Sequence, residues 1–332
     1  MTESNGDPKG VRLPRVGPRQ FRLLADASLV AVCVIVLTGA AVRLTGSGLG
    51  CPDWPSCFHR RFTPPLSFHP LVEFSNRLVT VVLVVLLAVT LLAALRRRPF
   101  RADLAWLSTG LLGGVLAQAV IGAIAVYTKL NPYVVLLHFL ASMVLVAVAV
   151  VLAHRSRRDY RPELASSLVP RTVVLGGRLV LTLLGVVLVA GTVTTGSGPH
   201  AGNATGQLVA RRIPVALRDM AELHSSLALL LIGVTVGLAI ALHAMPIPER
   251  VRRAARILCA ALAAQAVVGY AQYFSHLPVA LVEIHVLGAT LLTAGAVRFH
   301  LSLTGHPQEA PDVAPATSSR AGARASKVKV AG

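Results

Sequence analysis

Eight long stretches of apolar residues constrain this chain more than any other feature of its sequence. Each has about 20 residues or more, which is enough for a helix to cross the ~30 Å hydrocarbon core of a membrane. The stretches cover residues 25–44, 71–95, 102–126, 132–154, 173–195, 218–243, 254–273 and 279–302. Because a helix satisfies its own backbone hydrogen bonds within lipid, the sequence predicts an all-α membrane protein with eight transmembrane helices.

Basic residues cluster in every second connection between these stretches. Of the 32 lysine and arginine residues, 22 lie in segments that we assign to the cytoplasm and only 6 in segments that we assign to the outside. Because basic residues are retained on the cytoplasmic side, both termini are predicted to lie in the cytoplasm. The net charge of +18 therefore indicates orientation and contact with anionic lipid, and no nucleic-acid partner is expected.

The chain contains an internal repeat. The segments QAVIGAIAVYTKLNPYVVLLH at 118–138 and QAVVGYAQYFSHLPVALVEIH at 265–285 match at seven positions with an offset of 147 residues. The sequence TGSG occurs at 45–48 and again at 195–198, with an offset of 150. One unit used twice in parallel orientation explains both matches, so we predict two pseudo-symmetric four-helix bundles related by an axis along the membrane normal.

The repeat divides the chain into five parts. We predict an N-terminal four-helix half at 25–154 and a C-terminal four-helix half at 173–302, joined by a cytoplasmic linker at 155–172. Residues 1–24 and 303–332 are rich in Pro, Gly, Ser, Ala and charge, a composition typical of disordered tails. Any functional site is therefore expected within the two halves.

Polar residues recur in the first turns of the second, fourth, sixth and eighth stretches, which all enter the membrane from the outside. They are Glu73, Asn76, His138, Glu222, His224, Glu283 and His285. A lone membrane histidine usually has a structural hydrogen bond, but three at one depth, two of them related by the repeat, favour metal ligands. Because ionisable groups are costly to bury in a membrane, this layer predicts a functional site.

His224 and His285 belong to the same half and are expected to face each other. Two such imidazoles can hold a haem iron as its axial ligands. A structural zinc site would require four nitrogen or sulfur ligands, and no cysteine is placed to complete that set. We therefore predict a haem between these two histidines.

The ordered set of motifs resembles the heme A synthase family. The matching pieces are RLTGSGLGCPDWPSC (43–57), EFSNR (73–77), QAVIGA…H (118–138), TGSGPHAGN (195–203), ELH (222–224) and QAVVGY…H (265–285). The resemblance covers residues 25–302 and implies a bacterial plasma-membrane oxidoreductase. Such an enzyme oxidises a methyl group of heme O, by successive hydroxylation, to the formyl group of heme A for cytochrome oxidase. It carries a haem b cofactor in the C-terminal half and takes its substrate haem in the N-terminal half.

The resemblance also implies roles for individual residues. His224 and His285 match the axial ligands of the haem b iron, and His138 matches a histidine ligand of the substrate haem iron. Glu73 matches a carboxylate that the family needs for catalysis. The family pattern there is Glu-x-x-His-Arg, but this chain has Asn76 in place of the histidine. Asparagine is a poor iron ligand, so the sequence leaves open whether the substrate haem is five-coordinate.

Cys51 and Cys57 match the cysteine pair of the family's first outer loop. A disulfide persists on the oxidising side of a membrane, where it would stiffen the loop. A redox-active pair that takes part in the reaction is the alternative. Cys33 and Cys259 lie inside spans and are expected to be packing residues.

Several polar side chains near the outer edge have two interpretations. Arg43 and Arg77 are suited to binding haem propionates, or they mark the membrane boundary. Glu73 could shuttle protons near the substrate, or it could brace the bundle by pairing with Arg43 or Arg77. Gln118 and Gln265 are expected to form hydrogen bonds that help packing.

Two other functions are alternatives to the enzyme. A non-catalytic b-type electron carrier could use the same bis-histidine site, although it would not need a second haem pocket. A transporter built on the repeat would need broken helices near the membrane midplane. For the enzyme, the expected partners are heme O and membrane lipid, with a heme O synthase and an electron-transfer protein as candidate protein partners.

Overall fold

The computed structural model describes residues 15–58, 62–157, 166–202 and 210–305. Over these residues it contains eight helices that are long and apolar enough to cross a membrane. They are α1 (Pro18–Leu44), α2 (Phe68–Arg96), α3 (Ala102–Tyr127), α4 (Pro132–Ser156), α5 (Arg171–Ser197), α6 (Leu217–His243), α7 (Glu249–Phe274) and α8 (Val279–Ser302). The prediction of an all-α, multi-pass membrane protein is confirmed.

Helix α1 begins earlier than the sequence predicts. It starts at Pro18, so residues 18–24, which were expected in a disordered tail, are helical. Proline suits the first turn of a helix because its φ is already fixed and its missing N–H is not needed there. The Gln20 side chain accepts a hydrogen bond of 3.0 Å from the backbone N–H of Gly17 and closes this end. The tail prediction is therefore wrong for these residues, and residues 1–14 lie outside the described part.

A second correction concerns the end of α8. Strand β1 (Ser166–Ser167), in the predicted linker, pairs antiparallel with β2 (Thr304–Gly305). Residues 303–305 were predicted to belong to the disordered C-terminal tail, and this pairing orders them. The linker residues 158–165 and the tail from residue 306 lie outside the described residues.

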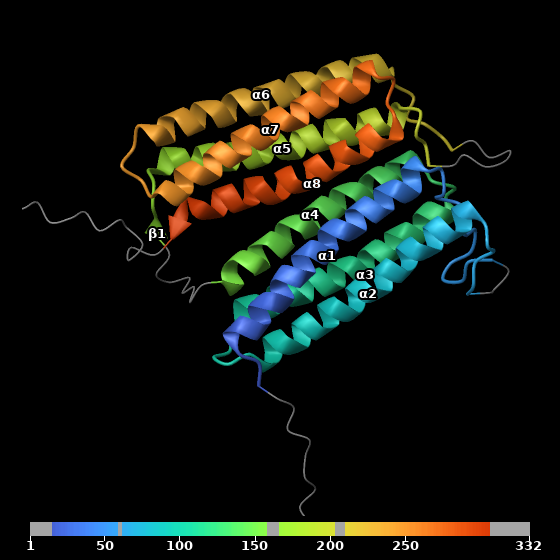
Figure 1. Ribbon diagram of the computed structural model, residues 1–332, viewed down its shortest axis with the longest axis horizontal. Helices are drawn as coiled ribbons and strands as arrows, with labels where there is room; N and C mark the ends of the chain where they lie inside the picture. Colours follow the sequence, from blue (N-terminus) through green and yellow to red (C-terminus); the bar gives the residue numbers. More distant parts are fainter. Residues whose placement is uncertain (1–14, 59–61, 158–165, 203–209, 306–332) are drawn as a thin grey trace, which may run out of the picture.

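Figure 1 shows helices α1–α4 packed in one group and helices α5–α8 in another. Within each group, successive helices pack side by side and the first packs against the fourth. As a result, α2 lies diagonally opposite α4, and α6 lies diagonally opposite α8. The two halves meet through α1, α4, α5 and α8. Side chains on the even-numbered helices can therefore meet across the interior of each half.

The internal repeat extends to the backbone of two loops. Lys129 and Leu130, between α3 and α4, have φ angles of 54° and 59°, and His276 and Leu277, between α7 and α8, have 62° and 60°. Non-glycine residues rarely adopt this left-handed conformation. In both loops the second residue donates its N–H to the carbonyl five residues earlier, at 2.7 and 2.8 Å. Because the two loops have the same geometry, α4 and α8 begin in equivalent orientations.

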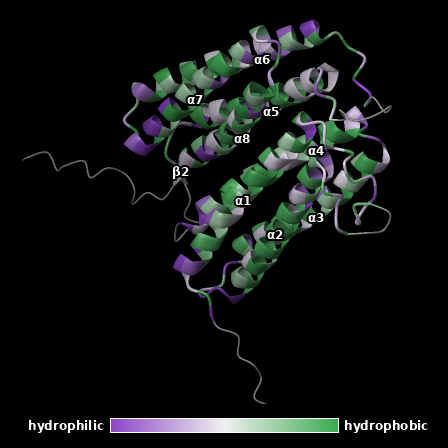
Figure 2. Ribbon diagram, turned by 45° about the vertical axis from the view of Figure 1, so that its right-hand side comes forward, coloured by the Kyte–Doolittle hydropathy of each residue, from purple (hydrophilic) through white to green (hydrophobic). Residues whose placement is uncertain are grey.

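Hydropathy follows the helix axes. Figure 2 shows apolar residues along the length of the helices and hydrophilic ones gathered toward their ends. Hydroxyl groups inside the helices bond to the preceding turn, as in the 2.8 Å bond from Ser108 to the Leu104 carbonyl. Because lipid offers no hydrogen-bond partners, this internal satisfaction makes such residues compatible with a membrane span.

Candidate functional site

The polar residues identified from the sequence lie in the first turns of the even-numbered helices. Glu73 is in α2, His138 in α4, His224 in α6 and His285 in α8, each within the first eight residues of its helix. Figure 1 shows that these four helices begin at the same end of the two halves, which we call the outer end. The structure thus places the three histidines and Glu73 at a common depth.

His224 and His285 face each other across the second half. Their ring centroids are 6.3 Å apart, and the ring planes are inclined at 72°. A bond from a first-row transition metal to an imidazole nitrogen is about 2 Å long, so two imidazoles on opposite sides of one metal have centroids roughly 6 Å apart. The observed separation fits two axial ligands of a single haem iron.

The remaining ring contacts are also compatible with a metal. The Nδ1 atom of His224 lies 3.1 Å from the carbonyl oxygen of Val187, and a hydrogen bond of this kind leaves Nε2 available to a metal. The Nδ1 atom of His285 is buried and has no hydrogen-bond partner among the described residues. The hydrogen bond to Val187 orients the His224 ring, and the two facing rings together fit the ligand pair of a haem iron.

A zinc site is not supported. Within the described residues there is no group of three or more His, Cys, Asp or Glu side chains that could hold a metal ion. A haem brings four nitrogen ligands of its own and needs only one or two from the protein. The paired imidazoles therefore favour a haem over a protein-ligated ion.

Glycines leave room for the histidine rings. A Cβ atom built on Gly191 would lie 2.8 Å from Cε1 of His224, and one built on Gly269 would lie 3.2 Å from Cε1 of His285. Both separations are shorter than an ordinary van der Waals contact. Any side chain at these two positions would therefore displace a ring.

Gln118 and Gln265 hold the helix turns that carry the repeat-related histidines. The Gln118 side-chain amide donates to the carbonyl of His138 at 2.8 Å, and Gln265 donates to that of His285 at 2.9 Å. The prediction that both glutamines form hydrogen bonds within their bundles is confirmed. These bonds tie α3 to α4 and α7 to α8 at the level of the histidines.

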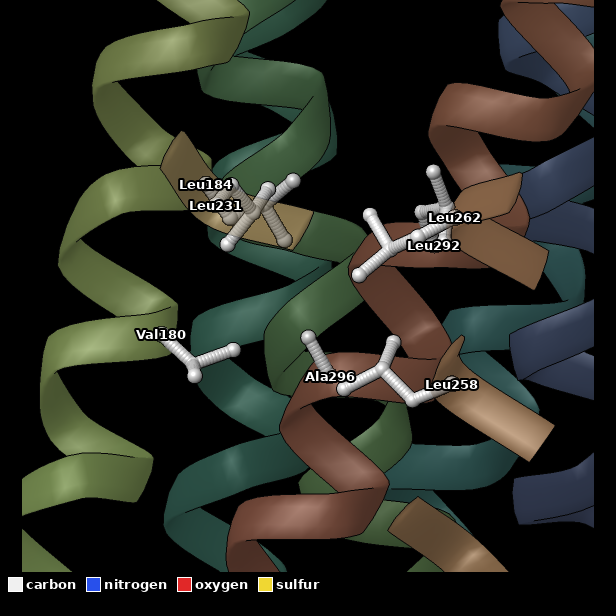
Figure 3. Close-up of a pocket in the computed structure, with 7 residues that line it drawn as sticks. All are labelled: Val180, Leu184, Leu231, Leu258, Leu262, Leu292 and Ala296. Carbon is white, nitrogen blue, oxygen red and sulfur yellow. The ribbon is translucent and has the colours of Figure 1, made fainter. Parts of the chain in front are cut away.

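Apolar side chains close the second half on the inner side of the histidine pair. Figure 3 shows side chains from all four helices of this half pointing toward one another: Val180, Leu184, Leu231, Leu258, Leu262, Leu292 and Ala296. They leave no space large enough to admit a water molecule. This packed layer begins about two helical turns from His224 and His285 and confines a bound group to the outer end.

In the first half, His138 corresponds to His285, and Asn76 stands on α2 where the second half has His224 on α6. The Nδ1 atom of His138 is buried without a hydrogen-bond partner among the described residues, as in His285. On the diagonally opposite helix, Asn76 accepts a 2.7 Å hydrogen bond from the Thr38 hydroxyl through Oδ1. Thr38 and Asn76 line an open pocket of about 340 Å³, together with Ala41, Phe68, Leu71, Val72, Ser75 and Val79. The first half therefore offers one imidazole and a pocket.

Glu73 and Arg77 hold the loop between α1 and α2. Glu73 is buried, with 6% of the residue exposed, and its carboxylate accepts from the Cys51 N–H at 2.8 Å and from Arg77 at 2.7 Å. Arg77 also donates to the carbonyls of Cys51, Asp53 and Ser56 at 3.1, 2.9 and 2.8 Å. The ion pair considered for Glu73 is thus present with Arg77, and its catalytic role stays a prediction.

Arg43 connects the two halves. Its Nε atom donates to the carbonyl of His200 at 3.0 Å, and its Nη2 atom donates to that of Thr195 at 3.1 Å. Close by, the N–H of Gly48 donates to the carbonyl of Gly202 at 2.9 Å. The segments 43–48 and 195–202, each of which contains a TGSG sequence, therefore meet at the outer end. Arg43 is anchored across this junction, and its contact with a haem propionate stays a prediction.

The predicted disulfide joins Cys51 and Cys57. Both residues are buried, in the loop held by Glu73 and Arg77. Cys33 and Cys259 are free thiols. The extensive hydrogen bonding of this loop favours the structural interpretation of the bridge over a redox-active pair.

Replacing both Cys51 and Cys57 with serine should lower stability but leave activity and haem content near normal. Closing a loop this short is worth about 2 kcal/mol, and Arg77 would still hold the loop carbonyls. Thermal unfolding in detergent and haem quantification check this expectation. A variant with normal haem content and no turnover would show that the pair is redox-active instead.

Thr38, Ala41 and Gly191 are site residues that sequence reasoning missed. They are small and common, and nothing in their own stretch marks them as special. Aligning the two TGSG segments would have placed Ala41 opposite Gly191, at an offset of 150. Their importance depends on which side chain of the neighbouring helix lies against them.

Comparisons with known proteins found a matching family and several similar proteins. The model of the cytochrome oxidase assembly protein family (COX15-CtaA) matches residues 22–69 and 67–297. A protein named heme A synthase from Geobacillus kaustophilus is 40% identical over 107 residues, 32% of this chain and 33% of the relative. Another of that name, from Geobacillus thermodenitrificans, is 38% identical over 152 residues, 44% of this chain and 46% of the relative. A third, from Bacillus pumilus, is 35% identical over 135 residues, 40% of this chain and 44% of the relative. The chain thus aligns with less than half the length of each of these relatives.

Proposed function

This chain belongs to the cytochrome oxidase assembly protein family, and on that premise we propose that it is a heme A synthase. The reaction would oxidise a methyl group of heme O to the formyl group of heme A. The observation that carries the proposal is the pair of facing imidazoles in the second half, His224 and His285, beside a first half whose described residues place His138 and a pocket at the same end. Two unequal sites suit one resident haem and one haem that is replaced in each turnover.

In this proposal the second half holds a haem b cofactor. His224 and His285 would hold it, and Gln265 fixes the turn that carries His285 through a 2.9 Å hydrogen bond. The packed apolar layer keeps water from reaching this site through the inner half of the bundle. The haem supplies the one-electron redox chemistry that protein side chains lack.

The first half would bind the substrate heme O, with His138 as its ligand. Glu73 lies at the same depth and is proposed to hold or move a proton at its carboxylate during oxidation of the methyl group. Arg43 and Arg77 are proposed to contact the haem propionates, because guanidinium groups bind carboxylates through paired hydrogen bonds. The Cys51–Cys57 loop would lie above this site.

The proposed setting is the bacterial plasma membrane with both termini in the cytoplasm. Support comes from the excess of basic residues in alternate connections. The site then lies near the outer surface. A heme O synthase and an electron-transfer protein are the proposed protein partners.

Production of heme A tests the proposal. The full chain is expressed in cells that make heme O but lack a heme A synthase, and extracted haems are separated by chromatography. We expect a heme A peak that is absent without the chain. If the extract instead contains haem b and unchanged heme O, while the purified protein cycles reversibly between oxidised and reduced forms, the protein is a b-type electron carrier.

A further inference from the structure

The two halves keep the same histidine surroundings on one side of the site. In the second half, Gly269 leaves room for His285, and a Cβ on it would lie 3.2 Å from the ring. In the first half, Gly122 lies against His138, where a Cβ would be 3.6 Å from the ring. Both glycine and histidine recur at an offset of 147 residues. The contact between a glycine and a histidine ring on this side of the site is therefore kept in both halves.

On the other side, the first half has neither the glycine nor the histidine of the Gly191–His224 contact. When α1 and α5 are aligned on TGSG, Ala41 takes the place of Gly191. The second half has His224 against Gly191, and the first half has Asn76 in the pocket beside Ala41. A Cβ on Gly191 would approach the His224 ring to 2.8 Å. The methyl group of Ala41 thus stands where a histidine ring placed like His224 would need space.

Among the described residues that line the pocket beside Asn76, there is no His, Cys, Asp or Glu side chain. Asn76 is held by the Thr38 hydroxyl at 2.7 Å, and an amide is a poor ligand for iron. The pocket of about 340 Å³ is many times the ~30 Å³ that one water molecule occupies in the liquid. Two of its lining residues, Phe68 and Leu71, are 61% and 39% exposed, so the pocket opens at the surface of the bundle.

We infer that the haem of the first half has His138 as its only protein ligand and that the other axial position is an exchangeable site opening on the Asn76 pocket. This inference rests on the proposed function, which places a haem in that half. The site would take small ligands that bind iron through a lone pair. Carbon monoxide and imidazole are suitable probes. Ala41 and Asn76 act together, so a histidine introduced at position 76 alone would not reach the iron.

Carbon monoxide binding tests the inference without measuring turnover. In the reduced, haem-loaded wild-type protein, we expect carbon monoxide to bind about one of the two haems, and imidazole to convert the same haem to a low-spin form. Asn76→His should still bind carbon monoxide. The double variant Ala41→Gly/Asn76→His should lose this binding and show a second low-spin haem, while Ala41→Gly alone is the matched control and should bind like the wild type.

Three results would overturn the inference. They are a wild-type protein with two haems and no carbon monoxide binding, loss of binding in Asn76→His alone, and a double variant that folds, holds two haems and still binds carbon monoxide fully. The imidazole titration of the wild type provides a test if the double variant does not fold. A wild-type protein that holds only one haem after loading with heme O, with a haem content unaffected by His138→Ala, would remove the inference and the proposed function together. Two low-spin haems with normal heme A production would remove the inference alone.

Discussion

Replacing His285 with alanine is expected to remove the haem of the second half. The ring faces His224 at a centroid separation of 6.3 Å, and one imidazole cannot provide both axial ligands. Loss of a residue that only supports a metal ligand commonly costs 10- to 100-fold in metal affinity, so removing the ligand should lower haem occupancy by at least ~10-fold. Haem quantification and the low-spin absorption bands of the purified protein measure this loss.

His224→Ala should produce the same loss, because we propose that the two rings bind one iron. The matched control is His243→Ala, which changes an exposed histidine at the other end of α6. His243 is 19 residues from His224, or roughly 28 Å along the helix. The control should keep its haem and its spectrum. An unchanged pigment in either His224→Ala or His285→Ala would refute the haem site.

Replacing Glu73 with glutamine is expected to lower heme A production by about 100-fold, a typical contribution of one acid–base group. Glutamine keeps the shape of the side chain and can still accept the Cys51 N–H. It cannot carry the charge that faces Arg77 or transfer a proton as a carboxylate does. The haem of the second half should be unaffected. Turnover of heme O in membranes, normalised to the low-spin haem, measures the effect.

Glu222→Gln is the matched control for Glu73→Gln. Glu222 lies at the start of α6 and pairs with Arg218 at 2.9 Å, but their side chains are 64% and 80% exposed. A surface ion pair of this kind contributes little, so this variant should produce heme A at the wild-type rate. If the loss of turnover in Glu73→Gln is accompanied by protease cleavage in the Cys51–Cys57 loop, the loop has loosened. Glu73 then braces the loop and has no catalytic role. Full turnover in Glu73→Gln would also exclude that role.

The eight helices were predictable because the membrane imposes a local rule. A span must be about 20 residues long and apolar, and this property can be read from each stretch separately. The beginning of α1 at Pro18 was missed because residues 18–24 are polar enough to lie outside the lipid. Helix formation there depends on proline, on the Gln20 cap and on continuity with the span.

The candidate site was predictable in its residue types and depth. The repeat relates His138 to His285, and helix direction puts the histidines at one end. The spacing of the His224 and His285 rings was not predictable, because it depends on how α6 and α8 lie across the bundle. The partner of Glu73 was also undecided, since the sequence allowed both Arg43 and Arg77.

The sequence by itself determined the number of spans, the two-fold repeat and the layer in which polar residues collect, because hydropathy and chain direction are local properties. Only the tertiary structure decided which side chains meet. It turned Arg43 toward the second half, paired Glu73 with Arg77 and set Ala41 beside the Asn76 pocket. These contacts join different helices, and in a bundle the packing of whole helices fixes them.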